Sequence, residues 1–174
     1  FGLAYRTDFD LKNHTEKSGK DLRYIDLVSG EKFIPHVVEP TFGLTRTVLI
    51  SLINAYEEVE GGRTTTTESV KEVETVLRLP YWMAPIQAAV LPLSKKPPLQ
   101  EGAQKITQDL QGNWRVQYDD TGSIGKRYRR QDEVGTPFCI TYDFESVNDH
   151  KVTIRDRDSM KQDRIGIDQL ADYL

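Results

Sequence analysis

Residues 118–138 read Tyr-Asp-Asp-Thr-Gly-Ser-Ile-Gly-Lys-Arg-Tyr-Arg-Arg-Gln-Asp-Glu-Val-Gly-Thr-Pro-Phe. A short strand runs into an acidic pair and then into a Gly/Ser turn that starts a helix. Four cations and one aromatic residue follow between Lys126 and Arg130, and a Gly-Thr-Pro break leads into the apolar run Phe138–Tyr142. A basic helix with an aromatic residue between two strands suits a nucleic-acid backbone. A solvated amphipathic helix explains the same stretch equally well.

The amino-acid composition limits the classes of protein to which this chain can belong and the kinds of partner that it can bind. The chain has 174 residues, of which 37% are hydrophobic and 29% charged, and its formal net charge is −4. These values fit a polar-surfaced globular protein of one domain, or one domain and part of another. No run approaches the roughly 18 apolar residues of a membrane span. The negative charge excludes a generic polyanion binder, so any nucleic-acid contact must come from a local patch.

Cysteine and histidine usage argues against disulfides and metals. Cys139 is the only cysteine, which excludes an intrachain disulfide and a cysteine zinc cluster. The three histidines lie far apart without metal-binding spacing, so no bound metal is expected. A reducing, cytoplasmic location is the natural interpretation. Residues 1–6 lack a starting Met and a signal-peptide layout, and we expect the chain to be a piece of a longer protein.

The first third of the chain is expected to be mainly extended. Residues 1–6 alternate as a strand, residues 8–21 read as its polar continuation, and residues 22–27 and 31–38 predict an antiparallel hairpin. Pro40 holds the preceding residue extended at the strand's end.

A helix is predicted after Gly43. The positive charge of Arg46, in the first turn, is unfavourable beside the positive end of the helix dipole. Sequences tolerate such a charge where it has a function. The alternative is that Arg46 is a solvated side chain. The apolar face of this helix recurs at helical period. It comprises Leu44, Val48, Leu49, Leu52, Ile53 and Tyr56.

The rest of the chain predicts a connector and a small α/β domain. Residues 60–75 are polar and of low complexity, and the domain boundary is placed there. Beyond them strands and helices alternate, which predicts a mixed sheet. The predicted strands are 84–93, 114–118, 138–144 and 152–158, and the predicted helices are 99–112, the basic helix around 126–130, and 169–174.

Motifs along nearly the whole chain resemble the C-terminal part of the dimeric, class II glycyl-tRNA synthetases. The connector is the exception. The motifs are Gly2–Leu11, Val38–Arg46, Ala89–Leu93, Asp119–Phe144 and Val152–Met160. The resemblance implies that residues 1–59 form the end of an antiparallel class II catalytic domain with its third motif. It also implies that residues 60–75 are a linker and that residues 76–174 form a mixed-sheet α/β anticodon-binding domain.

The resemblance also implies site residues. Glu39 would bind the amino group of glycine, and Thr41 would help to close a pocket too small for a larger side chain. Arg46 would grip the ATP phosphates as the catalytic residue of the third motif, with Gly43 beside it at the ATP site. A guanidinium near a helix N-terminus suits an anion. Mg²⁺ would accompany ATP as in the family, and the intact enzyme would be a homodimer.

For the second domain the resemblance implies contact with tRNA-Gly, because splayed anticodon bases are read by side chains while cations hold the backbone. The candidates are Lys126, Arg127, Tyr128, Arg130, Arg155 and Arg157. Strand alternation puts Arg155 and Arg157 on one sheet face, and a salt-bridged, exposed strand is the alternative there.

The expected function is therefore that of a glycine–tRNA ligase. The first and second class motifs are absent from this chain, so the intact enzyme would activate glycine with ATP while this chain alone would not. The alternative is a non-catalytic RNA-binding or accessory module, and a purely structural domain is a third possibility. Retention of Glu39, Thr41 and Arg46 argues against both.

Overall fold

The structure is a computed structural model that describes residues 1–63 and 73–174. These divide into two units, Phe1–Ile50 and Ser51–Leu174. The predicted boundary at 60–75 stays a prediction, and its central residues, 64–72, lie outside the described residues.

A mixed five-stranded sheet organises the second unit, with strand order β11-β10-β9-β7-β8. The central strand β7 runs parallel to β8 and β9, whereas β10 is antiparallel to both β9 and β11. This confirms the predicted mixed α/β fold. The strands are β7 (Ala88–Pro92), β8 (Val116–Tyr118), β9 (Phe138–Tyr142), β10 (Lys151–Asp156) and β11 (Gln162–Gly166).

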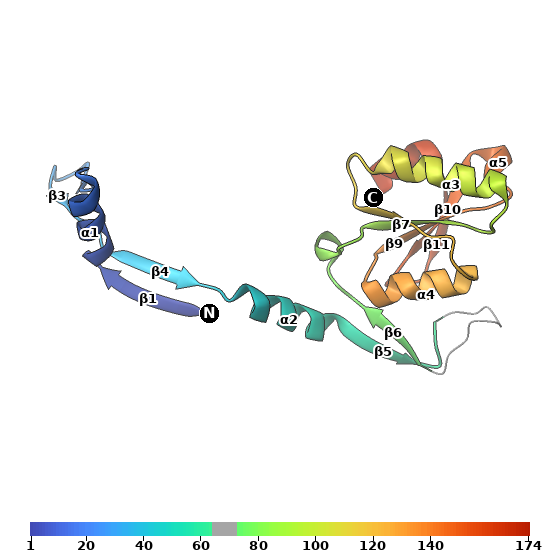
Figure 1. Ribbon diagram of the computed structural model, residues 1–174, viewed down its shortest axis with the longest axis horizontal. Helices are drawn as coiled ribbons and strands as arrows, with labels where there is room; N and C mark the ends of the chain where they lie inside the picture. Colours follow the sequence, from blue (N-terminus) through green and yellow to red (C-terminus); the bar gives the residue numbers. More distant parts are fainter. Residues whose placement is uncertain (64–72) are drawn as a thin grey trace. The chain divides into compact units, whose positions relative to one another are not determined.

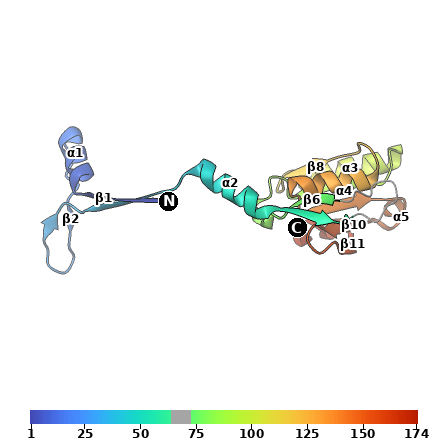
Figure 2. The same cartoon turned by 90° about the horizontal axis from the view of Figure 1, so that it is seen from below.

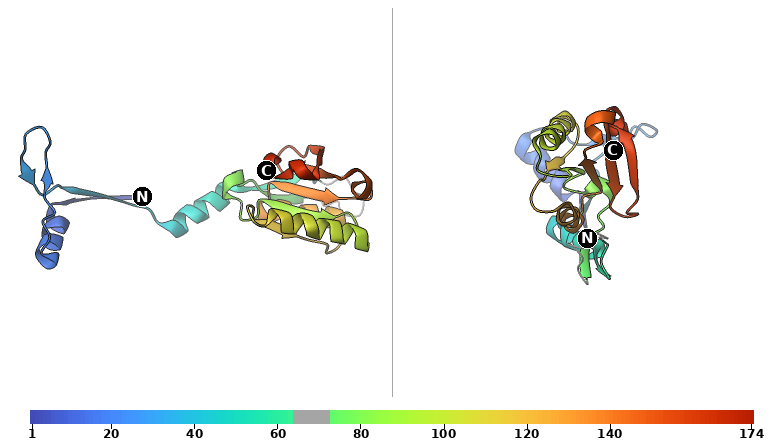
Figure 3. Two further views of the ribbon diagram at one scale, coloured as in Figure 1. Left: turned by 90° about the horizontal axis from the view of Figure 1, so that it is seen from above. Right: turned by 90° about the vertical axis from the view of Figure 1, so that its right-hand side faces the viewer.

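Helices cover both faces of this sheet. Figure 1 shows α3 (Pro97–Leu110) on one face and α4 (Ile124–Val134) on the other. The left panel of Figure 3 looks onto the α3 side, and Figure 2 looks from the α4 side. Four short helical segments complete the unit: η1 (Tyr81–Met83), α5 (Ser146–Asp149), η2 (Ile167–Gln169) and α6 (Leu170–Tyr173).

Strand alternation divides the core into two layers. Ala88 and Val90 pack with the α3 layer, while Ala89, Leu91 and Cys139 pack on the α4 side. Because both faces of β7 are covered, all five of its residues are buried and it reads as a continuous apolar run. Its predicted N-terminal end, residues 84–87, instead follows η1 as a turn.

Two glycines permit close packing around this sheet. A Cβ at Gly102 on α3 would lie 2.4 Å from the ring of Tyr142, so only glycine lets the helix approach β9 this closely. Gly135 ends α4 with a φ of 82°, and a Cβ there would lie 2.9 Å from the carbonyl oxygen of Leu77. Both positions therefore require glycine for steric reasons.

A hairpin precedes the five-stranded sheet. Strands β5 (Tyr56–Glu60) and β6 (Val73–Leu77) pair antiparallel, and β6 contacts α4. The two described ends of the predicted connector thus overlap strands β5 and β6, and Tyr56 belongs to β5 rather than to the preceding helix. The physical reason is burial: the side chains of Val76 and Glu74 are buried, and this stabilises an extended conformation in a segment whose sequence is polar.

The first unit is built from short elements. Strands β1 and β4 pair antiparallel, as do β2 and β3, which confirms the predicted hairpin. Residues 9–18, expected as a polar continuation of the strand, form a helix closed by Gly19 at a φ of 67°. The elements are β1 (Gly2–Thr7), α1 (Phe9–Ser18), β2 (Tyr24–Ile25), β3 (Lys32–Phe33), β4 (Val37–Thr41) and α2 (Leu44–Ala55), the last of which continues into the second unit.

Candidate functional site

Glu39 and Thr41 lie on β4, two residues apart and therefore on one face of the strand. The pairing with β1 sets Glu39 opposite Ala4 and Thr41 opposite Gly2. Thr41 Oγ1 donates a hydrogen bond of 3.4 Å to the carbonyl oxygen of Gly2. Both side chains are exposed, so they can meet a ligand without a change in the strands.

Arg6 links this strand pair to α1. Its guanidinium donates two hydrogen bonds to Asp10, of 2.8 and 2.9 Å, and its Nε lies 3.9 Å from Glu39 Oε2. The hydrogen bond with Asp10 raises the pKa of Arg6, and the same bond lowers the pKa of Asp10. Glu39 therefore has a fixed cation at its side, a neighbour whose role the sequence left open.

Arg46 lies in the first turn of α2 and is exposed. Gly43 precedes the helix, and a Cβ there would lie 3.8 Å from Arg46 Cβ, in ordinary contact. Thr47 donates its backbone N–H to the Gly43 carbonyl, 3.0 Å away, which sets the start of the helix. The guanidinium thus projects from a helix N-terminus beside a residue without a side chain, as an anion site requires.

Three of the predicted tRNA-contacting arginines are buried instead. Arg127 is 2% exposed and donates to the carbonyl oxygens of Pro92 and, at 2.7 Å, of Gly122. Burial lowers the pKa of Arg127, with nearby carboxylates acting against it. Its expected place on the surface is wrong: this guanidinium ties the N-terminal turn of α4 to the end of β7.

Arg155 lies in β10 and Arg157 one residue past its end, and both point to the same side, as alternation predicts, where they contact α4 and the glycine that ends it. Arg155 is 2% exposed and its Nη2 donates to Asp132 Oδ1 at 2.5 Å. Arg157 is 1% exposed and donates to the carbonyl oxygens of Leu79 (2.8 Å) and Gly135 (2.9 Å). Both predicted surface positions are therefore wrong. The alternative of an exposed, salt-bridged strand is wrong only in its exposure: Arg155 pairs with Asp132 and Arg157 with Asp158, but both side chains are buried and β10 has a strand on each side.

Tyr128 is likewise part of the interior packing. Its ring lies 4.4 Å from the guanidinium carbon of Arg155, and its hydroxyl shares a 2.5 Å hydrogen bond with Thr141 Oγ1. Burial raises the pKa of the Tyr128 hydroxyl. One face of the ring is thus covered by Arg155 and the ring is partly buried against the core, which conflicts with its expected role as a stacking residue.

The structure adds one residue that the sequence did not single out. Arg63, three residues past the end of β5, donates its backbone N–H to Glu74 Oε2 at 2.5 Å. Its Nη1 lies 3.6 Å from Asp132 Oδ2, so one carboxylate serves both Arg63 and Arg155. Only the tertiary contact reveals this group, because 69 residues of sequence separate Arg63 from Asp132.

Lys126 and Arg130 keep their predicted outward position on α4. Lys126 is exposed, while Arg130 is partly exposed and donates to Asp119 Oδ2 at 2.5 Å. Burial opposes ionisation of Asp119, but hydrogen bonds from Thr121 and Arg130 outweigh it, so the pKa of Asp119 is lowered. The acidic pair at the strand end thus orients a cation, as a partner rather than a catalytic group.

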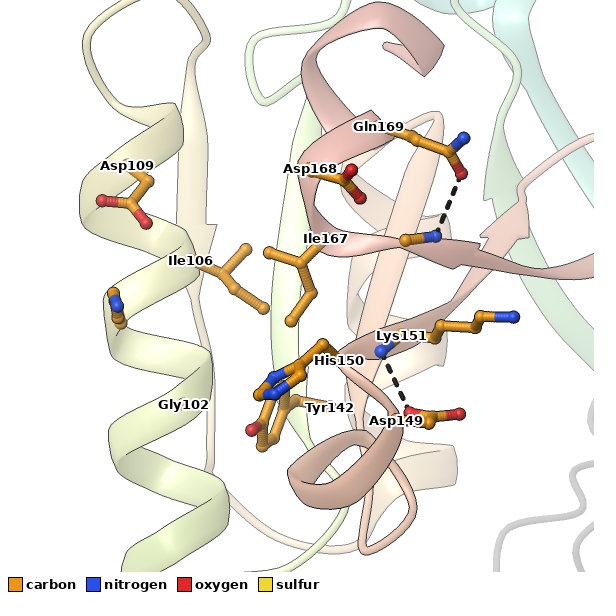
Figure 4. Close-up of a pocket in the computed structure, with 12 residues that line it drawn as sticks. Gly102, Ile106, Asp109, Tyr142, Asp149, His150, Lys151, Ile167, Asp168 and Gln169 are labelled. Carbon is orange, nitrogen blue, oxygen red and sulfur yellow. Dashed lines mark hydrogen bonds between the residues drawn. The ribbon is translucent and has the colours of Figure 1, made fainter.

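A larger groove on the opposite side of the sheet carries charges of both signs. It measures about 920 Å³ and lies between α3 and the β10–β11 end of the sheet (Figure 4). Its carboxylates include Asp149, which accepts the backbone N–H of Lys151 at 3.0 Å. Lys105 and Lys151 line the same groove as Asp109, Asp149 and Asp168. Such a mixed lining gives no single-sign field for a phosphate backbone.

Two further searches concern metals and membranes. Within residues 1–63 and 73–174, no group of three or more His, Cys, Asp or Glu side chains is arranged to hold a metal ion. No helix in that part of the chain has the length and apolar character of a membrane span.

Comparison with known proteins gives one family and many relatives. The family described as "Anticodon binding domain" matches residues 87–174. A glycine–tRNA ligase of Caldanaerobacter subterraneus subsp. tengcongensis is 55% identical over 176 residues, covering 100% of this chain and 36% of the relative. The glycine–tRNA ligase of Geobacillus thermodenitrificans is 52% identical, with 100% and 35% covered. This chain thus spans about a third of the length of these relatives.

A solved structure is also similar. The RNA-binding domain of threonyl-tRNA synthetase from Cryptosporidium parvum is 30% identical with a TM-score of 0.49, covering 53% of this chain and 24% of that one.

Proposed function

The chain belongs to the anticodon-binding domain family, and from this premise we propose that it works as part of a glycine–tRNA ligase. The resemblance to glycyl-tRNA synthetases is confirmed by the identity over the whole chain. One observation carries the proposal: the match to a relative that is 55% identical covers 100% of this chain, so it spans the stretch from Glu39 to Arg46 as well as the anticodon-binding domain. A binding module alone has no use for the first of these.

In the proposed enzyme, glycine is activated with ATP to an adenylate and then transferred to tRNA-Gly. The exposed carboxylate of Glu39 selects the ammonium group of glycine by a charge-assisted hydrogen bond. Thr41, on the same strand face, closes the space in which a larger side chain would lie. Arg6, 3.9 Å away, holds the position of the Glu39 carboxylate.

Arg46 supplies charge stabilisation to the ATP phosphates, which adenylate formation needs more than an acid or base. The helix start at Gly43 adds its dipole to the guanidinium. Mg²⁺ accompanies ATP, and this chain is not assigned a ligand for it. We propose that the intact enzyme is a cytoplasmic homodimer.

The second unit binds the anticodon arm of tRNA-Gly. Lys126 and Arg130 remain surface candidates, and a local basic patch on an acidic chain is consistent with contact to the RNA backbone. Arg127, Arg155, Arg157 and Tyr128 support this surface from inside, because each is engaged by the protein itself.

The activation step is tested on the intact ligase. Arg46→Ala is expected to slow ATP–pyrophosphate exchange by about 10²- to 10³-fold, the loss typical of a removed stabilising donor. Glu39→Gln is expected to raise the glycine KM about tenfold or more, because a charge-assisted contact is lost. Lys105→Gln, on the exposed side of α3, is the control. A near-parental exchange rate for Arg46→Ala, or no exchange by the intact parent, would favour the non-catalytic module.

A further inference from the structure

The outer face of α4 has an unusual combination of burial and charge. Lys126, Arg129, Arg130 and Glu133 fall at i, i+3, i+4 and i+7, so they share one face of the helix. Together they line a hollow of about 280 Å³. Three of the four residues are cationic, in contrast to the mixed lining of the groove by α3.

Arg129 is the most informative member. It is 8% exposed, yet it makes no hydrogen bond or ion pair with any part of the chain that the structure describes. Lys126 likewise has no such partner among the described residues. The nitrogens of Arg129 are not among the fully buried, unpartnered side-chain atoms of the described residues, so the guanidinium meets solvent in the hollow. An anion that enters the hollow would therefore complete its interactions.

The neighbours of Arg129 leave its charge uncompensated. Arg130 is fixed by Asp119 and by the carbonyl oxygen of Thr121 at 2.6 Å. Glu133 lines the hollow as its one acidic side chain and is itself engaged in an interaction. The nearby carboxylate of Asp119 is already used by Arg130.

From these contacts we infer that the hollow binds a phosphate of the RNA backbone, with Arg129 as the anchor and Lys126 as the second cation. The planar fork of a guanidinium matches the oxygens of a phosphate. Arg130, oriented by Asp119, contributes charge from a fixed position. The inference rests on the proposed function and sharpens it: this face positions the RNA and does not read its bases.

The test uses the full 174-residue chain and a fluorescent tRNA-Gly anticodon stem-loop, with binding followed by anisotropy between about 50 and 200 mM salt. Arg129→Gln is expected to weaken binding about tenfold and to make the slope of log K against log salt shallower by about 0.7 to 0.9, one phosphate contact. Arg129→Lys should retain the parental slope. Lys126→Gln, at an exposed position that cannot disturb packing, should give the same change in slope as Arg129→Gln.

Lys105→Gln is the matched control, because it removes one positive charge on the opposite side of the sheet. If the parent binds with salt dependence but Arg129→Gln and Lys126→Gln behave like Lys105→Gln, the phosphate site is overturned while the proposed function stands. If Arg129→Gln lowers the affinity but leaves the slope of log K against log salt unchanged, the phosphate site is also overturned, because that result indicates a contact with a base. Failure of the parent to bind the stem-loop would overturn both.

Discussion

The two units use their charged residues in opposite ways. In Phe1–Ile50 no side chain is buried, and the predicted substrate residues Glu39 and Arg46 stand exposed on strand and helix. In Ser51–Leu174 a two-layered core is present, and half of the predicted tRNA-contacting residues are inside it. The difference teaches that a basic motif indicates function only where the fold leaves its charges unengaged. Within a packed unit, arginine is first a structural residue.

Hydrogen exchange offers the strongest test of this contrast. Backbone amides of β1 and β4 are expected to exchange orders of magnitude faster than those of β7 and β9, because local opening follows the amount of buried apolar contact. The measurement is exchange of the 174-residue chain followed by mass spectrometry. Amides of β10 should match β9, which serves as the internal control. Comparable protection in β1 and β7 would show that the two units are equally stable and would break the comparison.

Removing one buried carboxylate tests whether the interior arginines are structural. Asp132→Ala leaves Arg155 buried without its partner and should cost about 3–5 kcal/mol in free energy of unfolding. The measurement is denaturant unfolding followed by tryptophan fluorescence, which reports only the second unit because both tryptophans, Trp82 and Trp114, lie there. Asp109→Ala, an exposed acid on α3, should cost no more than about 0.5 kcal/mol.

A double variant sharpens the same point. Asp132→Ala combined with Arg155→Met removes both charges of the Arg155–Asp132 pair and should recover part of the loss, because an apolar replacement of a buried ion pair is often tolerated. Arg63 also loses the Asp132 carboxylate in both variants and keeps its hydrogen bond to the carbonyl oxygen of Arg157. Equal loss in the single and double variants would contradict the assignment of the cost to an unpaired arginine. A loss below about 1 kcal/mol in Asp132→Ala would show that water reaches Arg155.

Much of the fold follows from sequence because the decisive signals are local. The apolar run of β7 and the Gly-Thr-Pro break before β9 are visible as strings of letters, and they place the central parallel strands correctly. The hairpin of β5 and β6 was missed because its stability comes from α4, which lies about 50 residues further along the chain. A polar alternating segment carries no sign of what will cover it.

The residues of the candidate site also divide into those that local sequence can place and those that it cannot. Lys126 and Arg130 were predicted, and their outward direction follows from helical period alone. Arg155 and Arg157 could not be judged, since alternation assigns two residues to one face without saying which face is exposed. Arg129 is not among the tRNA-contacting residues predicted from the sequence, and only the absence of a partner within the described residues shows its importance.

A partly exposed ion pair in the second unit gives the smallest expected effect. Asp143 accepts hydrogen bonds from Arg164 (2.8 Å) and from the backbone N–H of Ser146 (2.9 Å). Burial opposes ionisation of Asp143, but these hydrogen bonds together outweigh it and lower the pKa of the carboxyl. A lowered folded-state pKa adds stability above the unfolded value of about 3.9, and this contribution is lost as the pH falls below it.

Asp143→Asn should therefore cost about 1 kcal/mol at neutral pH, since the ion pair with Arg164 is lost while an acceptor for Ser146 remains. The difference between variant and parent should shrink as the pH falls through the folded-state pKa of Asp143, which lies below its ordinary value, because the parental carboxyl then becomes protonated. Glu145→Gln is the matched control: Glu145 also approaches Arg164, at 3.6 Å, but its side chain is 82% exposed. If the loss of stability in Asp143→Asn stays constant from neutral to acid pH, the loss is due to packing. The ion pair would then resemble the solvated charges of the first unit rather than the engaged charges of the second.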